Sequence, residues 1–285
     1  MSFITLQDVS YKYPLAKTFA LKHVDLSFEK GKFYGIIGQN GAGKTTLCNL
    51  VRGLVPHFYG GSLTGKTIID GTDVKKWDTD QLATQIGYVL SKTPFTQISG
   101  VKETVFEEIA LGLENLGIPK DEMIERVIRV CKLLKIEDLI KRDPNALSGG
   151  QRQRVAFAAI IAMDSDTLVI DEPTSQLDPE GTADVFAIIQ LLKEQGKTVL
   201  LVEHKIDLLA EYADEIVVLE KAQVAFQGPA QEVLQNPALL EHGAQIPQVA
   251  LLGSKLKEKG IGLAHIPITQ KDAIAAIEER LGGES

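Results

Sequence analysis

Residues 38–46 read GQNGAGKTT, so three glycines are interleaved with small and polar residues ahead of a lysine and two threonines. This segment fits the spacing G-x-x-x-x-G-K-[ST], in which backbone N–H groups turn inward around phosphate oxygens. Lys44 is expected to place a positive charge on the β- and γ-phosphates, and the Thr45 hydroxyl is expected to bind magnesium. The predicted nucleotide-binding residues are Gly38, Gln39, Asn40, Gly41, Ala42, Gly43, Lys44, Thr45 and Thr46.

Two acidic residues end the apolar run at 167–172, which reads TLVIDE. Carboxylates are rarely kept at the end of a buried strand without a partner. Beside a phosphate site, Asp171 is predicted to hold Mg²⁺ directly or through water. Glu172 is predicted to orient and polarise the attacking water, because an ordinary carboxylate is too weak a base to deprotonate it fully.

A third segment, 147–151, reads LSGGQ and is followed by Arg-Gln-Arg. Ser148 and the two glycines are expected to open a helix, whose N-terminus is a ready anion site. Because the chain already carries a complete phosphate loop, this second site is expected to serve the nucleotide of a partner subunit. The segment closely resembles the signature motif of ABC ATPases. The resemblance implies ATP hydrolysis, a head-to-tail dimer, and contacts from Ser148, Gly149, Gly150 and Gln151 to the partner's ATP.

Further residues match the ABC family one by one. Tyr13 resembles the aromatic residue that stacks on adenine, with Tyr11 as a neighbouring alternative. The segment 175–178 resembles the loop that communicates across the dimer, which gives Asp178 that role. His204 resembles the switch histidine that senses the γ-phosphate, so the resemblance makes it a catalytic residue together with Glu172.

One position departs from the family pattern. The family usually has a glutamine after the segment that reads IGYVL here, where it bridges magnesium and the interface with the membrane domain; this chain has Ser91. Gln97, further on, is more like a second glutamine found in one branch of the family. Ser91 or Gln97 is therefore the further candidate metal contact. The shorter serine also favours an asymmetric pair of ATPase subunits.

The helices and strands expected to position these residues follow one another along the chain. Segments 4–11 and 21–28 alternate apolar and polar residues, as half-buried antiparallel strands do. A strand at 33–37 runs into the phosphate loop and a helix at 43–53, and helical periodicity dominates 101–163. Strands at 167–170, 198–202 and 215–219 then alternate with helices, which implies parallel strands with ligands at their carboxyl ends. Thr269 is expected to cap a last helix with Asp272 in its first turn.

The resemblance implies an α/β fold of the P-loop NTPase type, as in ABC ATPases. Its parts would be a RecA-like parallel-sheet core, an antiparallel β subdomain, a helical signature subdomain at about 91–164 and a small C-terminal extension. We expect a nucleotide-binding domain at 1–228 and an accessory or dimerisation segment at 229–285.

Three segments further resemble the energy-coupling factor (ECF) branch of the family: 53–61, 202–205 and the tail at 246–251. In that branch the tail contributes to ATPase pairing. For His57, within the first segment, a packing role is preferred to metal ligation, because one histidine is a poor metal site.

Composition excludes several classes. Hydrophobic residues make up 44% and charged residues 24% of 285 residues, which is typical of a globular protein. The net charge of -8 argues against non-specific nucleic-acid binding. Two cysteines without CxxC spacing indicate neither a disulfide framework nor a zinc site. The first residues do not resemble a signal peptide, and the apolar run 155–163 is too short to cross a bilayer.

The predicted function is therefore that of an ATP-binding and hydrolysing subunit of an ECF-type ABC importer, with ATP and Mg²⁺ as ligands, powering uptake of a vitamin or metal ion. Its partners would be a second ATPase subunit (homodimer or, preferably, heterodimer), a transmembrane coupling protein and a substrate-binding membrane protein, with no nucleic acid. It would act as a peripheral protein on the cytoplasmic face of the cell membrane. The alternatives are the ATPase of a conventional ABC importer or exporter and a soluble, non-transport ABC ATPase.

Overall fold

The computed structural model describes residues 2–90, 98–175 and 177–282. The chain forms two compact units, the first of Met1–Lys76 with Leu200–Ser285 and the second of Trp77–Val199. The chain enters the second unit after Lys76, and the second boundary falls inside one buried strand, β8 (Thr198–Val202). The chain therefore passes from the second unit to the first through a strand rather than a loop.

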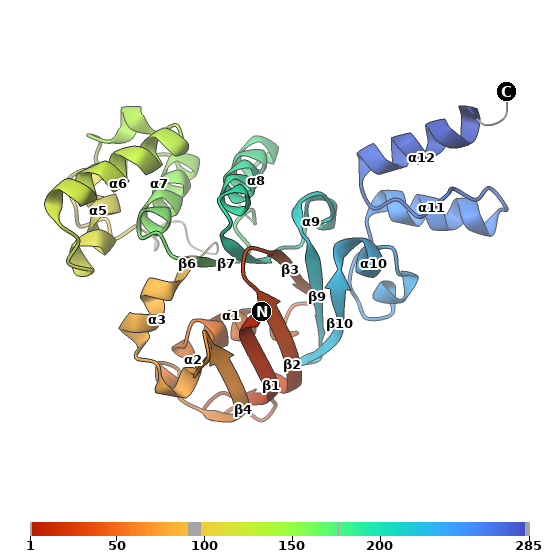
Figure 1. The fold of residues 1–285 in the computed structure, drawn as a ribbon, viewed down its shortest axis with the longest axis horizontal. Coiled ribbons are helices and arrows are strands. Elements are labelled where there is room, and N and C mark those ends of the chain that lie inside the picture. The colour runs from red at the N-terminus through yellow and green to blue at the C-terminus, as the bar shows by residue number, and fades with distance from the viewer. Residues whose placement is uncertain (1, 91–97, 176, 283–285) are drawn as a thin grey trace. The chain divides into compact units, whose positions relative to one another are not determined.

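The first unit contains an antiparallel sheet of four strands in the order β2-β1-β4-β5 (Figure 1). They are β1 (Ser2–Lys12), β2 (Leu21–Glu29), β4 (Ser62–Ile69) and β5 (Thr72–Asp73). Leu6 lies opposite Leu26, and Val9 lies opposite Val24. All four side chains are buried, so the alternating pattern puts one face of both strands into the core. The antiparallel strands predicted near the N-terminus are confirmed.

The same unit holds the strand that leads to the phosphate loop. This strand, β3 (Phe33–Gly38), is parallel to β9 (Glu215–Glu220), which pairs in turn with antiparallel β10 (Gln223–Pro229). The order in this unit is β10-β9-β3-β8. Residues 33–37 of β3 and 216–219 of β9 are all buried, as expected for strands covered on both faces.

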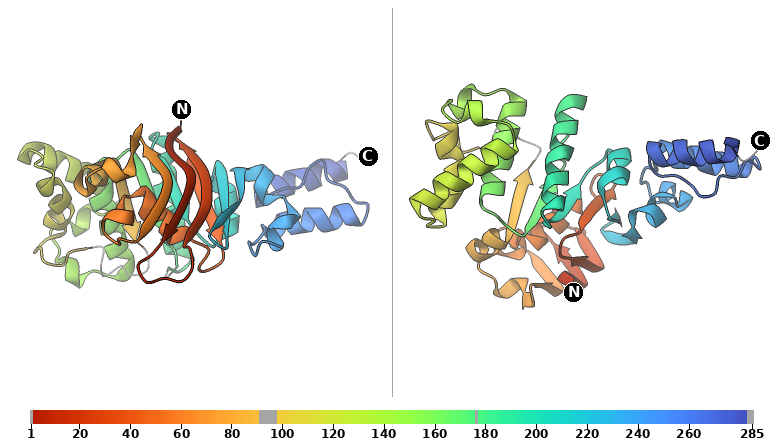
Figure 2. Two further views of the ribbon diagram at one scale, coloured as in Figure 1. Left: turned by 90° about the horizontal axis from the view of Figure 1, so that it is seen from below. Right: turned by 45° about the horizontal axis from the view of Figure 1, so that its top comes forward.

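The α-helices described in the first unit are α1 (Lys44–Val51), α2 (Leu54–His57), α9 (Ile206–Tyr212), α10 (Ala230–Leu234), α11 (Gln248–Glu258) and α12 (Gln270–Gly282). The last two lie side by side beyond α10, as Figure 2 shows. The Thr269 hydroxyl accepts from the backbone N–H of Asp272 at 3.2 Å, so the predicted cap of the last helix is confirmed. The His57 ring Nε2 lies 2.9 Å from the Val74 carbonyl oxygen, a local structural contact.

The second unit carries two parallel strands, β6 (Ile86–Leu90) and β7 (Thr167–Asp171), with Ile86 opposite Thr167. Its helices are α3 (Thr79–Gln85), α5 (Val105–Asn115), α6 (Lys120–Leu133), α7 (Gly149–Ala162) and α8 (Pro179–Glu194). The helical content predicted for 101–163 is confirmed as α5, α6 and α7, which contact one another. Within the described residues, no helix is both long and apolar enough to span a membrane.

Four of the described strands were not predicted: β4, the two-residue β5, β6 and β10. In β4 the outer half is polar and only Thr67 and Ile69 are buried, while no residue of β10 is fully buried, so neither has a clear pattern. Short β6 follows α3 directly and lacks a turn signal that would separate the two. The fold class is confirmed, since both parallel and antiparallel strands are present with helices between them.

Candidate nucleotide site

The phosphate loop follows β3 directly and requires glycine at two points. Gly38 has φ +145°, and a Cβ there would lie 2.2 Å from the Leu219 carbonyl oxygen. Gly43 has φ +107°, and a Cβ there would lie 2.6 Å from the Ala20 carbonyl oxygen. Side chains at these points would collide with backbone, so both the dihedral angles and the space demand glycine. The loop is thereby held close to the backbone on either side of it.

Lys44 lies at the start of α1 and is almost completely buried. Its Nζ donates to the Gly38 carbonyl at 2.7 Å and to the Gln39 carbonyl at 3.0 Å. The ammonium group is therefore centred on the loop, beside the N-terminus of α1. A buried ammonium and a helix N-terminus are together suited to a polyphosphate.

The two tyrosines proposed for the base differ in burial. Tyr11 is fully buried and donates its hydroxyl to the Gly60 carbonyl at 2.7 Å. Burial, with smaller contributions from Tyr13 and Tyr59, raises the pKa of Tyr11. Tyr13 is half-buried, and its hydroxyl lies 3.3 Å from the Thr46 hydroxyl. Tyr13 therefore lies beside the loop with part of its surface accessible, whereas Tyr11 belongs to the core.

His204 follows β8 and is exposed, next to a buried acid that sequence reasoning missed. The Glu203 carboxylate accepts from the backbone N–H of His204 at 2.7 Å and from that of Lys205 at 3.2 Å. Glu203 thus fixes the backbone that presents His204. A cavity of about 220 Å³ lies here, lined by residues from 37–40, 203–206 and 243–245. The phosphate loop and His204 therefore border the same cavity.

Asp171 and Glu172 lie in the second unit, at the carboxyl end of β7, and both are buried. Glu172 has φ +53°, a left-handed conformation that is uncommon for a residue with a side chain. Just beyond it, the Pro173 carbonyl accepts from the Gln153 side-chain amide at 2.5 Å. Gln153 is buried on α7, so this helix holds the chain immediately after the two acids. Sequence reasoning gave Gln153 no role.

Ser148 begins α7 as predicted. Its hydroxyl accepts from the Gln151 N–H at 3.3 Å, and the Gln151 side chain accepts from the Ser148 N–H at 3.0 Å, which forms a capping box. Gly149 and Gly150 are exposed, and a Cβ at either would meet nothing within 4 Å. Packing among the residues that the structure describes therefore does not explain these two glycines.

Asp178 is the N-cap of α8, and its carboxylate accepts from the Gly181 N–H at 2.7 Å. The residue is exposed. It therefore has a local structural role besides the dimer communication predicted for it.

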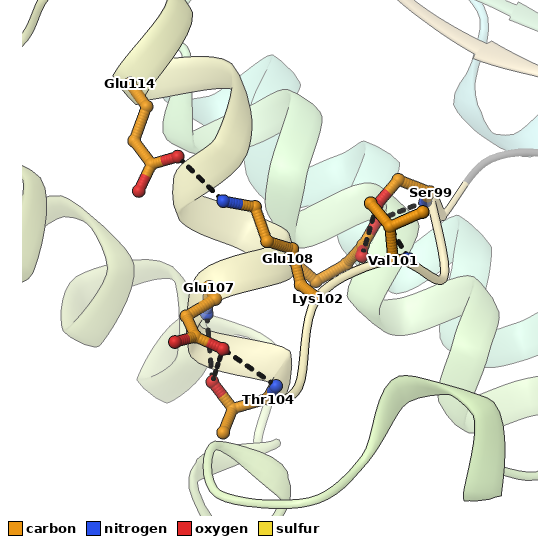
Figure 3. A network of polar contacts seen from close by, with 7 residues as sticks. All are labelled: Ser99, Val101, Lys102, Thr104, Glu107, Glu108 and Glu114. Atoms are coloured by element: carbon orange, nitrogen blue, oxygen red, sulfur yellow. Dashed lines mark hydrogen bonds and ion pairs between the residues drawn. The ribbon is translucent and has the colours of Figure 1, made fainter.

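Ser91 and Gln97 lie outside the described residues, and the metal contact predicted for one of them stays a prediction. After Ile98, the chain is hydrogen-bonded to α5 through a buried carboxylate, as Figure 3 shows. The Glu108 carboxylate accepts from the Ser99 hydroxyl at 2.8 Å, from the Ser99 N–H, and from the Gly100 N–H at 3.3 Å. Beside them, the Val101 side chain is 80% exposed.

The predicted site residues fall into two groups. The first unit brings together Tyr13, the loop 38–46 and His204, and the second unit carries 148–151, Asp171, Glu172 and Asp178. Because Thr45 and Asp171 lie in different units, their shared role toward Mg²⁺ stays a prediction.

The known proteins similar to this chain include ABC transporter ATP-binding proteins. The family model described as "ABC transporter" matches residues 21–175. An ABC transporter ATP-binding protein of Pyrococcus abyssi is 40% identical over 99% of this chain and 100% of its own length. The energy-coupling factor transporter ATP-binding protein EcfA2 of Streptococcus sanguinis is 37% identical over 93% of this chain and 96% of its own.

Two solved structures are similar in fold. One is cbiO1 from Clostridium perfringens, part of the ABC transporter complex cbiONQ, with a TM-score of 0.74, 27% identity, and coverage of 91% of this chain and 98% of its own. The other is an ATP-binding cassette solved as a dimer in a post-hydrolysis state with ADP and phosphate. Its TM-score is 0.67 at 27% identity, with coverage of 80% of this chain and 98% of its own.

Proposed function

Because this chain belongs to the ABC transporter family and is an ATP hydrolase of that family, we propose that it powers an ECF-type importer for a vitamin or a metal ion. It acts there as one of two ATPase subunits, preferably two different ones. Its membrane partners are a coupling protein and a substrate-binding protein, and it works on the cytoplasmic face of the cell membrane. Relatives named as ECF transporter ATP-binding proteins support this assignment.

The proposal of two ATPase subunits is supported by the start of α7. The helix N-terminus at Ser148 is exposed, and a Cβ at Gly149 or Gly150 would meet no described residue within 4 Å. Glycine near the start of a helix costs up to about 1 kcal/mol relative to alanine. A closely approaching ligand accounts for that cost, and the chain's own Lys44 already serves a phosphate loop. The ligand proposed for Ser148, Gly149 and Gly150 is the triphosphate bound to the partner subunit.

The residues then divide the work of hydrolysis. The loop N–H groups and Lys44 bind the β- and γ-phosphates, and Tyr13 stacks on the adenine. When bound, Mg²⁺ neutralises phosphate charge, and Thr45 and Asp171 are the residues that would hold it. Glu172 orients the attacking water, and His204, held by Glu203, contacts the γ-phosphate.

The test is the substitution Glu172→Gln. It keeps the size of the side chain but removes the charge that polarises water, so ATP turnover is expected to fall by about two orders of magnitude or more. ATP binding is expected to persist, with nucleotide-dependent dimers accumulating because the bound ATP is not consumed. Steady-state phosphate release and light scattering measure the two effects.

Glu180→Gln is the matched control, since it makes the same chemical change on the exposed first turn of α8. It is expected to hydrolyse ATP at the wild-type rate. Unchanged hydrolysis by Glu172→Gln would remove Glu172 from its proposed role. A wild-type chain that never accompanies a membrane subunit, when produced with its genomic neighbours, would favour a soluble, non-transport ATPase instead.

A further inference from the structure

A turn in the C-terminal extension lies beside the phosphate loop. After the 3₁₀ turn Pro237–Leu240, residues 243–245 line the same cavity as residues 37–40 of the loop and His204. The sequence predicts an accessory or dimerisation role for residues 229–285. Their proximity to the loop indicates that the extension also borders its own chain's nucleotide site.

The contact is made by Gln39 and Gly243. Gly243 has φ +68°, and a Cβ built on it would lie 1.8 Å from Gln39 Nε2, 2.6 Å from Cδ and 2.9 Å from Cγ. The outer half of the Gln39 side chain therefore lies directly against the glycine backbone. The left-handed conformation favours glycine at position 243, and the outer atoms of the exposed Gln39 side chain would have to move to admit a Cβ there.

The turn that carries Gly243 is fixed on its own side. The Gly243 N–H donates to the Leu240 carbonyl at 3.1 Å, and the Ala244 N–H donates to the Leu239 carbonyl at 3.0 Å. Next to it, His242 Nδ1 lies 2.5 Å from a Glu220 carboxylate oxygen at the end of β9. A hydrogen bond from Lys221, followed by the one from His242, lowers the pKa of Glu220. These hydrogen bonds hold the turn against the sheet, so the backbone that Gln39 contacts is fixed in place.

Gln39 also contacts Lys44, the lysine proposed to bind phosphate. The carbonyl of Gln39 accepts from Lys44 Nζ at 3.0 Å. Gln39 therefore contacts the turn through its side chain and the ammonium group through its backbone carbonyl. A change of a few tenths of an ångström in such a hydrogen-bonded group alters binding geometry directly.

We propose that Gly243 is a positioning residue for ATP binding: the turn 242–245 seats the Gln39 side chain, and this seat sets the conformation of the phosphate loop. The extension thereby acts on the ATP affinity of its own chain, in addition to any pairing role. This inference rests on the proposed function, because it concerns the same nucleotide site.

The test is a double-mutant cycle on the full-length chain, with Gly243→Ala, Gln39→Ala and both together. Affinity for the non-hydrolysable analogue AMP-PNP is measured by calorimetry, and KM and kcat are measured for ATP. Gly243→Ala is expected to weaken binding about three- to tenfold and to raise KM by the same factor, with kcat changed less than about twofold. In the Gln39→Ala background, the same substitution is expected to change affinity by less than about twofold, because the group it displaces is gone.

Gly260→Ala is the matched control. Gly260 lies in the same extension with φ +77°, and a Cβ there would meet nothing within 4 Å. It therefore imposes the same backbone strain without touching Gln39, and its affinity is expected to equal that of the wild type. Gln39→Asn, whose shorter side chain withdraws from Gly243, gives a second measurement if Gly243→Ala does not fold.

Three results separate the possibilities. Equal affinities for Gly243→Ala and Gly260→Ala would overturn the inference, as would an effect of Gly243→Ala that is undiminished in the Gln39→Ala background. Failure of the wild-type chain to bind AMP-PNP would instead refute the proposed function.

Discussion

The backbone around Glu172 is held by a residue from another element. Glu172 has φ +53°, and the carbonyl of the next residue, Pro173, accepts from buried Gln153. A left-handed residue persists only where its surroundings fix it, because the conformation itself is unfavourable. We infer that Gln153 aims the Glu172 carboxylate by fixing the chain that follows it.

Gln153→Leu tests this inference. The variant leaves the Pro173 carbonyl without its donor, which is expected to lower the free energy of unfolding by about 1–3 kcal/mol. It is also expected to lower kcat more than it changes KM, because binding residues stay in place. Denaturant unfolding and ATPase kinetics measure both.

Gln190→Leu provides the comparison, since it removes only a solvent-exposed side-chain hydrogen bond to Glu194 on α8. It is expected to change stability by less than about 0.5 kcal/mol. If the two variants have the same kcat, Gln153 is a packing residue with no influence on Glu172.

At the scale of elements, α8 depends on Asp178 for its start. The carboxylate accepts from the Gly181 N–H, and Pro179 follows at the first helical position. The ABC resemblance gives the same residue a role in dimer communication. The two roles are separable, because asparagine caps a helix as well as aspartate but carries no charge.

Asp178→Ala is expected to lower the free energy of unfolding by about 1 kcal/mol, whereas Asp178→Asn is expected to change it by only a few tenths. Both are expected to reduce ATP turnover in the dimer, because both remove the charge. Thermal unfolding and ATPase assays distinguish these effects. Full ATPase activity in Asp178→Asn would mean that Asp178 only caps α8 and has no role in dimer communication.

The elements that sequence patterns predicted well are those whose signal is local. Buried apolar runs identified β7 and β8, and the capping pattern at Ser148 identified the start of α7. Strand β10 was missed because none of its residues is fully buried.

Three contacts near the candidate site were missed for another reason: those of Gln153 and Glu203, and the contact between Gln39 and Gly243. The contacts of Gln153 and Gly243 join residues 20 or more positions apart, and Glu203 bonds backbone groups that carry no sequence signal.

At the scale of the whole molecule, each unit carries part of what hydrolysis needs. The phosphate loop and His204 belong to the first unit, while Glu172 and the Ser148 helix start belong to the second. On the proposed assignment, Lys44 of the first unit binds the triphosphate and Glu172 of the second unit orients water, so turnover depends on both units. On the same proposal, the exposed helix N-terminus at Ser148 extends this dependence to a second subunit, and the C-terminal extension is the candidate surface for pairing.

That surface is formed by α11 and α12. They lie side by side (Figure 2) and expose apolar side chains, with Leu252 46% and Ile274 58% accessible. In a pair of ATPase subunits, burying one such side chain contributes about 1.5 kcal/mol or more, roughly a tenfold change in affinity. Ile274→Glu is therefore expected to weaken dimer formation by about tenfold in the ATP-loaded Glu172→Gln background, measured by light scattering across a dilution series.

Ala275→Glu places the same charge at the neighbouring exposed position without removing a large apolar side chain. If the extension pairs through Ile274, Ala275→Glu dimerises more strongly than Ile274→Glu, and both bind ATP as monomers with unchanged affinity. Equal dimer affinities for the two variants would mean that losing the Ile274 side chain has no effect on dimer formation beyond that of the added charge. Pairing would then depend on the nucleotide-bridged surfaces at Lys44 and Ser148, and the apolar face of α11 and α12 would have no part in it.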